Sequence, residues 1–456
     1  MNNLYAGFAR ADITPERGVG LSGYFFYRPN TGVLDNVEVN AVALQSGDKK
    51  VIIVTVDLCY IQTSINDEMR KVIAEATGVD ETAIFIHATH THTAPLAQLT
   101  PNFDTGDEES FKVIGEYVAF LIKRVRDTAL AAVEDLKPAT MGVGVGKAEN
   151  IAFIRRYRMK DGSVRTNPGV NNPDIVEPIG KLDESVNVIR LDREGANSIA
   201  IVNFADHPDT VGGSKVSGDW PSFTRRTVEK ALDDVSCIFL NGAQGDVNHV
   251  NVHPTPGYLN DMFMDFDDDA RGYKHAQYMG RVVAGAVLQV WDKVAYTDVD
   301  KINFAHKIVA IPSNMPSPEE LPLAQKYADL HNAGKDDEIP FEGMMLTTVV
   351  AESMRMIRLK DGPEAFNMRL SSISIGNVAF IGIPGEPFNS IGREIKAKAE
   401  GWDLVVPCCL TNGEEGYFPS TDAYTEGGYE ARSSSFKSGV AERIAEYSVE
   451  LLDSIR

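Results

Sequence analysis

The sequence is poor in several features that would assign it to particular classes of protein. It has four cysteines in 456 residues, and they show neither the density of a disulfide framework nor the Cys-x-x-Cys spacing of a structural zinc site. No uninterrupted apolar run approaches the roughly 18 residues that cross a bilayer, so we expect no membrane span. Low-complexity tracts, which are typical of disorder, are also lacking. These absences indicate a folded protein whose thiols are reduced and buried.

Basic residues are scarce relative to acidic ones, at 44 against 65, which gives a formal net charge of −21. This charge disfavours nucleic acid and anionic membrane surfaces as partners, because both would be repelled. The first residues contain no basic segment followed by an apolar run, so no signal peptide is visible. We therefore expect a cytoplasmic protein that acts on a small-molecule substrate, and the sequence leaves open whether it forms a homo-oligomer.

The sequence does contain a long alternation of strand-like and helical segments. Apolar runs rich in β-branched residues occur at residues 38–44, 50–58, 83–88, 139–146, 185–191, 198–204, 235–240, 367–375 and 378–383. Helical periodicity occurs at residues 65–77, 109–135, 220–233 and 274–290. This alternation predicts the α/β class.

The length of the chain exceeds that of one ordinary hydrophobic core. We expect one catalytic domain over residues 1–456 or two similar α/β lobes, because a strand–helix–strand rhythm near the end resembles one near the start. Residues 313–362 are polar and helical in pattern, which predicts a helical insertion at the surface. The acidic run at 261–270 predicts a solvated loop, since it lacks the glycine turn and closing glutamate of an EF-hand.

Three of the nine histidines follow one strand-like run closely, in the stretch AIFIHATHTHTAPL at residues 83–96. Side chains alternate between the two faces of a strand, so an extended chain would place His90 and His92 on one face and His87 on the other. We expect His90 and His92 to share a site, as metal ligands or as a ligand and an acid–base group. His87 is expected to be structural.

Two further strand-like runs end in residues that could complete such a site. One ends in Asp206 and His207, and the other, IGIPGEP, ends in Glu386. Ligands of α/β sheets collect at strand ends, and two imidazoles with one carboxylate form a common catalytic zinc set that leaves a position open. The alternative for Glu386 is an acidic group at the start of a helix near Phe388, where it would complement the helix dipole.

Seven stretches, taken in order, resemble the signatures of the neutral ceramidases and their shorter bacterial relatives: GFARADITP, LSGY, THTHTAP, NFADHPDT, NGAQGDV, IPGEPF and EGYFPSTDAYTEGGYEA. The resemblance extends from residue 7 to about residue 435. It implies a large mixed-sheet catalytic domain of neutral ceramidase type, without the carboxy-terminal β-sandwich of the longer members. It also implies one zinc ion per chain, bound by His90, His207, Glu386 and Tyr417, with Tyr429 as the alternative phenol or otherwise a wall of the pocket.

The chain departs from the family pattern after Gly245, Asp246 and Val247, where Asn248 replaces the ceramidase serine. An asparagine can donate a hydrogen bond to an oxyanion but is no nucleophile, so the reaction would have to rely on metal-activated water. His249 and His253 are additional titratable groups that could act as acid or base or contact substrate, and a role as ordinary polar loop residues is about as well supported.

Other candidates complete the expected site. Asp246 and His92 are expected to act in catalysis, with His92 orienting water or a substrate carbonyl. An arginine is implied after AENIAF, where Arg155 is favoured for the reacting centre and Arg156 for substrate binding. Asp57, near the end of a strand, is expected to support a ligating histidine.

The sequence thus predicts a zinc-dependent hydrolase that cleaves an amide, and with lower preference an ester or lactone, of a soluble sugar-derived or acylated small molecule. The first alternative is a true ceramidase or N-acyl lipid amidase. The second is a binding module that holds the metal but has lost catalysis, which the missing serine would explain.

Overall fold

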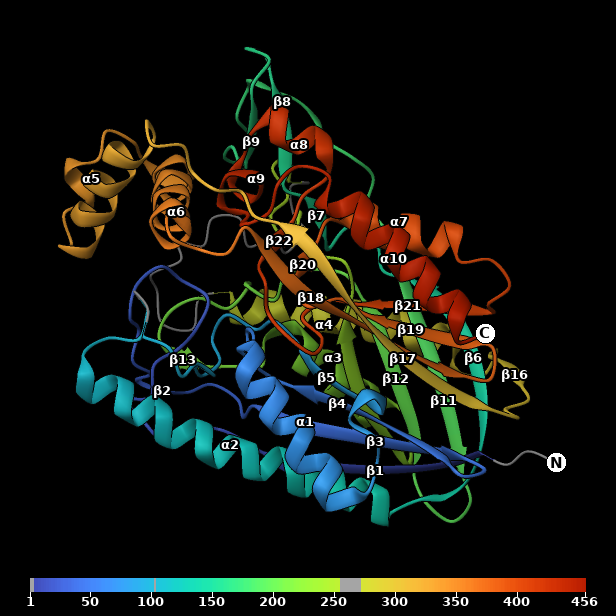
Figure 1. The fold of residues 1–456 in the computed structure, drawn as a ribbon. Helices are drawn as coiled ribbons and strands as arrows, with labels where there is room; N and C mark the ends of the chain where they lie inside the picture. The colour runs from blue at the N-terminus through green and yellow to red at the C-terminus, as the bar shows by residue number, and fades with distance from the viewer. Residues whose placement is uncertain (1–3, 102–103, 255–271) are drawn as a thin grey trace.

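The structure is a computed structural model that describes residues 4–101, 104–254 and 272–456. It contains a nine-stranded mixed sheet, a second sheet of four strands and helices packed against both (Figure 1). The predicted α/β class with a large mixed sheet is therefore confirmed. The acidic run at 261–270 lies outside the described residues.

Both sheets are built from three units that share one order of elements: three strands, a helix, a fourth strand and a final helix. The first unit consists of β1 (Leu4–Asp12), β3 (Glu38–Ser46), β4 (Lys49–Val56), α1 (Thr63–Thr77), β5 (Ile84–Ala88) and α2 (Glu108–Glu134). The second consists of β6 (Lys137–Lys147), β11 (Ser185–Arg193), β12 (Ser198–Phe204), α3 (Asp219–Ala231), β14 (Val235–Asn241) and α4 (Tyr273–Trp291). The third consists of β17 (Ile302–Pro312), β18 (Ala365–Ile375), β19 (Val378–Gly382), α7 (Asn389–Lys398), β21 (Leu404–Cys408) and α10 (Val440–Ser454).

Strand pairing is the same in each unit. The first three strands pair antiparallel in chain order, and the third then pairs parallel with the fourth across the intervening helix. The first two units join through an antiparallel contact between β1 and β6, which gives the order β14-β12-β11-β6-β1-β3-β4-β5. The rhythm that suggested two lobes thus occurs three times.

Shorter elements connect the units and carry several motifs. The strands are β2 (Gly32–Val33), β7 (Phe153–Ile154), β8 (Arg156–Met159), β9 (Val164–Thr166), β10 (Ile175–Pro178), β13 (Lys215–Val216), β15 (Val247–Asn248), β16 (Ala295–Thr297), β20 (Glu386–Pro387) and β22 (Tyr417–Phe418). The helices are η1 (Glu81–Ala83), α5 (Leu321–Asn332), η2 (Asp336–Glu338), α6 (Gly343–Leu359), α8 (Thr421–Glu426) and α9 (Tyr429–Ser433). Residues 313–362 lie between β17 and β18 and contain α5, η2 and α6, at the left of Figure 1.

The sheet of the third unit is buried on both faces. Alternate side chains of β19 enter different apolar clusters: Val378 and Phe380 pack with the first unit, whereas Ala379 and Ile381 pack with α7 and α10. Such a strand reads as a continuous apolar run rather than as an alternating one. The core therefore consists of layers, with α2 and α10 on opposite sides of the molecule (Figure 1).

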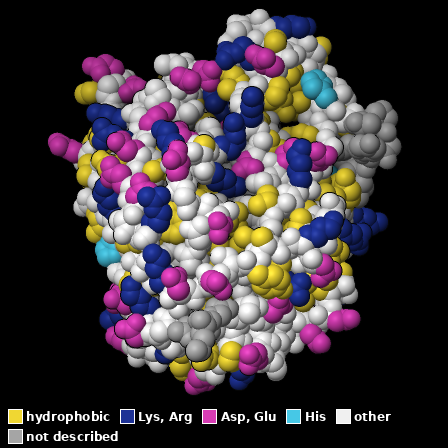
Figure 2. Space-filling view, turned by 90° about the vertical axis from the view of Figure 1, so that its right-hand side faces the viewer, with side chains coloured by type: hydrophobic (Ala, Val, Ile, Leu, Met, Phe, Trp, Pro, Cys, Tyr) yellow, Lys and Arg dark blue, Asp and Glu magenta, His cyan; other side chains and the backbone are white. Residues whose placement is uncertain are grey.

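The cysteines agree with the expectation that the thiols are reduced and buried. All four cysteines are buried and free. Among the described helices, none combines the length and the apolar composition of a membrane-spanning segment. Figure 2 shows one face of the molecule on which basic and acidic side chains are interspersed among apolar ones.

The three units meet at the ends of β5, β14 and β21, where His87 joins them. The Nδ1 atom of its buried ring lies 2.8 Å from the backbone oxygen of Cys409, and its Nε2 atom accepts a hydrogen bond of 2.8 Å from the backbone N–H of Asn241. This pattern requires the neutral ring protonated on Nδ1. Burial lowers the pKa of His87 to about 3, so the predicted structural role agrees with its contacts.

A buried ion pair ties α3 to the first unit. Both carboxylate oxygens of Asp57 accept from the guanidinium of Arg225, at 2.8 and 2.6 Å, and both side chains are almost fully buried. Asp57 also accepts from the hydroxyl of Thr89. Asp57 also accepts from the backbone N–H of Glu38, and it reaches the loop of His90 through Thr89 rather than through the imidazole itself.

We predict that Asp57→Asn lowers the free energy of unfolding by about 3–5 kcal/mol, because it leaves the buried Arg225 charge with only the partly exposed Glu38 carboxylate, 3.2 Å away. Urea denaturation measures this change. Asp127→Asn removes one side of the exposed pair with Arg126 and should cost only about 0–1 kcal/mol. Equal losses for the two variants would contradict the importance of the buried pair.

A second prediction concerns the acid side of the stability curve. A histidine that is neutral when folded contributes stability above its unfolded pKa of about 6.5, and this contribution is lost as the pH falls toward the folded value. The stability advantage of the wild type over His87→Gln should therefore shrink by up to about 1.4 kcal/mol per pH unit below pH ~6. Urea denaturation at several pH values tests this, with the exposed His253→Gln as the control. A difference that is the same at pH 7 and pH 5 would count against it.

Candidate metal centre

Three side chains from different units converge on one point. The Nε2 atoms of His90 and His207 lie 3.2 and 3.1 Å from the same carboxylate oxygen, Oε2 of Glu386. The two imidazole rings have centroids 4.7 Å apart. All three residues are buried. A cation placed between these atoms would meet two imidazole nitrogens and one carboxylate oxygen, which is a donor set that zinc accepts.

Loops beyond the strand ends position the two histidines, and a short strand positions Glu386. β5 ends at Ala88, and His90 has a left-handed backbone with φ of 77°. The alternation argument for His90 and His92 is therefore wrong, although their Nε2 atoms do lie 3.3 Å apart. His207 follows β12, and Glu386 lies in β20, whose parallel pairing with β22 places it beside Tyr417.

Backbone carbonyls fix both histidine rings. The Nδ1 atom of His90 lies 2.8 Å from the oxygen of Cys59, and that of His207 lies 2.9 Å from the oxygens of Gln244 and Val247. If each Nδ1 carries the proton and donates, each Nε2 presents its lone pair to the shared point. Metal-binding histidines are commonly oriented in this way.

The electrostatics of the cluster favour positive charge beside Glu386. Burial alone would raise the pKa of this carboxyl, but the His90 and His207 imidazoles hold it well below its usual range. Burial opposes a charged His90 ring, yet Glu386 raises the pKa of that ring well above its usual value. For His207, burial and the Arg155 guanidinium lower the pKa. A buried carboxylate needs a compensating cation, and a metal ion meets the same requirement as a proton on His90.

Tyr417 and Arg155 lie next to His207. The Tyr417 hydroxyl is 3.4 Å from the His207 Nε2 atom and accepts a hydrogen bond of 3.1 Å from Arg155 Nη2. Glu430 fixes Arg155 by accepting from its Nε atom at 2.7 Å. Burial raises the pKa of Tyr417 well above its usual value, and Arg155 only partly opposes this effect. Arg155 therefore supplies a positively charged donor at the edge of the cluster.

The structure distinguishes Arg155 from Arg156 and Tyr417 from Tyr429 by their contacts. Arg156 donates to Glu426 and to the backbone oxygen of Gly427, and so points away from the histidines. The Tyr429 ring packs edge-on against that of Tyr417, with centroids 5.6 Å apart. Arg155 and Tyr417 are thus the arginine and the phenol that contact the histidine cluster directly.

His92 occupies the other side of the cluster. Its ring packs against those of His90 and Tyr24. Gly23 makes this contact feasible, because a Cβ atom there would lie 2.6 Å from the His92 ring and its φ is +102°. Burial and the neighbouring His90 lower the pKa of His92 well below its usual value. The close contact with His92 therefore explains why the LSGY motif has a glycine at this position.

Asp246 and Asn248 form part of the turn behind the cluster. Asp246 Oδ1 accepts from the backbone N–H of Asn389 at the start of α7, and burial raises the pKa of this carboxyl to about 6. Asn248 donates to Asn167 Oδ1 at 3.2 Å. A Cβ atom at Gly245 would lie 2.4 Å from the Glu386 backbone oxygen, so only glycine allows this close approach.

The remaining candidates lie in different surroundings. His249 is buried, and its Nδ1 atom is 3.1 Å from the carboxylate of Asp209. His253 is an exposed loop residue. No sequence pattern indicates Glu430, Asn167 or Asp209, because each acts through a partner that is distant in the chain. Only the position of Glu430 within the GYEA stretch could have drawn attention to it.

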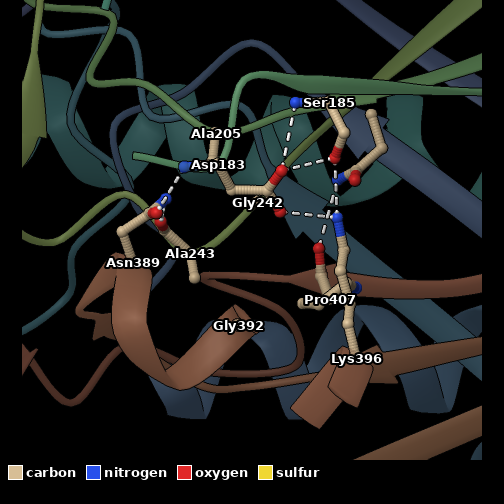
Figure 3. Close-up of a pocket in the computed structure, with 10 residues that line it drawn as sticks. Asp183, Ser185, Ala205, Gly242, Ala243, Asn389, Gly392, Lys396 and Pro407 are labelled. Atoms are coloured by element: carbon tan, nitrogen blue, oxygen red, sulfur yellow. Dashed lines mark hydrogen bonds and ion pairs between the residues drawn. The ribbon is translucent and has the colours of Figure 1, made fainter. Parts of the chain in front are cut away.

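A small cavity lies behind this turn, between the second and third units (Figure 3). Its volume of about 10 Å³ is near the minimum for one water molecule. Lys396 contacts Asp183 and Ser185, and Asn389 donates to the backbone oxygen of Ala243. This is a polar packing defect and too small for a substrate.

Comparisons with known proteins agree with this architecture. The neutral ceramidase from Pseudomonas aeruginosa superposes with a TM-score of 0.72 over 99% of this chain and 74% of its own, at 18% sequence identity. A ceramidase complexed with C2 superposes with a TM-score of 0.70 over 99% of this chain and 75% of its own, at 16% identity. No protein-family model matches the sequence, and no curated protein matches it significantly. The chain therefore has the fold of neutral ceramidase, which confirms the resemblance at the level of the fold.

Proposed function

We propose that the chain is a zinc-dependent hydrolase that cleaves a carbonyl bond of a small molecule, an amide first and an ester or lactone second. One observation carries the proposal: two imidazole Nε2 atoms of buried histidines lie within 3.2 Å of the same buried carboxylate oxygen. His90, His207 and Glu386 would hold one zinc ion per chain, with Tyr417 as the fourth ligand. The donor set fits zinc because the rings are fixed through Nδ1 and present Nε2.

A bound zinc ion would supply Lewis-acid chemistry, by activating water and polarising the substrate carbonyl. The chain's own groups do the rest. Arg155 stabilises negative charge on the carbonyl oxygen, because its guanidinium is held by Glu430 and directed toward Tyr417. His92 is neutral near pH 7 and accepts or returns a proton at Nε2.

The turn after β14 supports this arrangement. The backbone oxygen of Asp246 accepts from the backbone N–H of Arg155 at 2.9 Å, and Gly245 accepts from its guanidinium at 2.8 Å. The backbone at Asp246 therefore positions Arg155, while the Asp246 carboxyl accepts from Asn389, and Asn248 keeps one amide N–H for a substrate oxygen. Because Asn248 cannot serve as a nucleophile, the proposed reaction has no covalent acyl intermediate.

The substrate is proposed to be a sugar-derived or acylated small molecule. The second candidate is a ceramidase or N-acyl lipid amidase, which the likeness to neutral ceramidase favours. Zinc binding without turnover of amide, ester or lactone substrates would instead support a metal-holding binding module.

We predict that the purified protein binds about one zinc ion and that His90→Ala, His207→Ala and Glu386→Gln each lose it. Removing one ligand leaves an incomplete coordination shell. Elemental analysis after dialysis against dilute zinc measures the content, and His253→Ala, an exposed histidine, is the control that keeps it. Full occupancy in all three variants would show that the ligands lie elsewhere.

We further predict that Arg155→Ala lowers turnover by about 10²–10³ while zinc stays bound, because the variant loses the donor to the carbonyl oxygen. Tyr417→Phe should lose much more activity than stability, since it removes one oxygen and keeps the ring. Initial rates on a panel of amides, esters and lactones provide the measurement. Arg158→Ala, on the adjacent strand, is the control for Arg155. A large loss in Tyr429→Phe but not in Tyr417→Phe would move the phenol ligand to Tyr429.

A further inference from the structure

A groove of about 310 Å³ opens beside Tyr429. One side is the loop that continues from β9, including Thr166 and Asn167, and the other is the start of α6, including Glu342 and Met345. α6 and α9 lie next to each other at the upper left of Figure 1, with β9 above them. The volume is at the lower end of the range for small-molecule sites, ~300–1,000 Å³. The helical insertion therefore forms one wall of the groove.

Three contacts connect the groove to the proposed metal centre. Thr166 donates to Glu430 at 2.8 Å, and Glu430 holds Arg155. Asn167 accepts from Asn248. Tyr429 both lines the groove and packs on Tyr417. The groove is thus lined by residues that contact Glu430, Asn248 and Tyr417, which border the proposed metal centre.

The charges in the groove argue against an ionic ligand. The guanidinium of Arg165 pairs with Asp161 at 3.3 Å, and that of Arg432 pairs with Glu352, so both lining arginines are already compensated. The Glu342 carboxylate forms no hydrogen bond or ion pair with the described residues and would repel an anion. A cation would meet the two guanidinium groups in the groove lining, since the carboxylates that pair with them, Asp161 and Glu352, do not line the groove.

The uncommitted polar groups favour hydroxyl groups instead. The Asn167 side chain uses its oxygen for Asn248, and its Nδ2 atom has no partner among the residues that the structure describes. The hydrogen bond from Asn248 orients this amide at the groove. One amide donor, one carboxylate acceptor and the ring of Tyr429 suit a ring that carries several hydroxyls and an apolar face.

We propose that this groove is the subsite for an uncharged polyhydroxylated ring, such as a sugar, attached to the bond that is cleaved. The proposal rests on the proposed hydrolase function and names its substrate class. Met345, which is 40% exposed on α6, lines the groove and accepts from Arg432, so a larger side chain there would reduce the space for a ring. A long acyl chain is disfavoured, because it would cover the polar groups of the groove without forming hydrogen bonds to them.

The test uses two acetamides of the same ring size, N-acetylglucosamine and N-cyclohexylacetamide, which differ in their hydroxyl groups. Met345→Trp fills the groove from an exposed position, and Leu323→Trp, 54% exposed on α5, is the matched control. With the zinc-loaded protein, Met345→Trp should raise KM for the sugar amide about tenfold or more, as expected for the loss of one or two hydrogen bonds, with kcat unchanged. The cyclohexyl amide and the Leu323→Trp control should keep the wild-type values.

Binding of N-acetyl hexosamines, measured by ligand-observed NMR, separates this proposal from the hydrolase proposal. If wild type binds them without turnover and Met345→Trp does not, the subsite stands and the hydrolase function fails. Equal effects of Met345→Trp on both amides, or no hexosamine binding to the wild type, would overturn the subsite. A larger loss for a long-chain N-acyl amide than for the sugar amide would also overturn it. Glu342→Gln keeps an acceptor and should weaken binding only slightly, whereas a large loss would indicate a cationic ligand.

Discussion

The ends of β5, β14 and β21 are joined by hydrogen bonds around a single neutral imidazole, and the site depends on this junction. His87 contacts the backbone of Cys409 and Asn241, and Cys409 in turn donates to the oxygen of Asn241. The Asn241 amide then donates to the oxygens of Thr89 and Asp206, the residues that immediately precede His90 and His207. A charged His87 would leave the Asn241 N–H without its acceptor, and a displaced ring would also leave the Cys409 oxygen unpaired, so either change would loosen the junction.

The repeated unit explains why the ligands come from distant parts of the chain. In each unit the parallel pair of strands ends at the same edge, where α/β sheets place their ligands. The first unit supplies His90, the second supplies His207, and the third supplies Glu386 and Tyr417. Each ligand loop is attached to a buried strand, so the rings are held by rigid elements even though they lie on loops.

Buried charge at the site is compensated in pairs and chains. Glu386 faces two imidazoles, and Arg155 faces Glu430 and the Tyr417 hydroxyl. Asp57 and Arg225 form another buried pair of opposite charges away from the site. An isolated ion in such surroundings would cost several kcal/mol, so these groups must be present together or not at all. This requirement constrains the substitutions that the motifs can tolerate.

The sequence by itself determined the α/β class, most strand and helix positions, and the set of histidines and carboxylates that share a site. The spacing of apolar residues and the local composition are properties of a short segment. Buried strands such as 198–204 can therefore be recognised without knowing which strands lie next to them. The tertiary structure decided the rest. It showed three units instead of two lobes, placed His90 by a left-handed backbone and not by strand alternation, and gave Asp57 to Arg225. It also chose Arg155 over Arg156 for contact with the histidines and brought Glu430 to Arg155. These outcomes depend on contacts between residues that are distant in the chain, such as Asp57 with Arg225 and Arg155 with Glu430, and no local pattern encodes them.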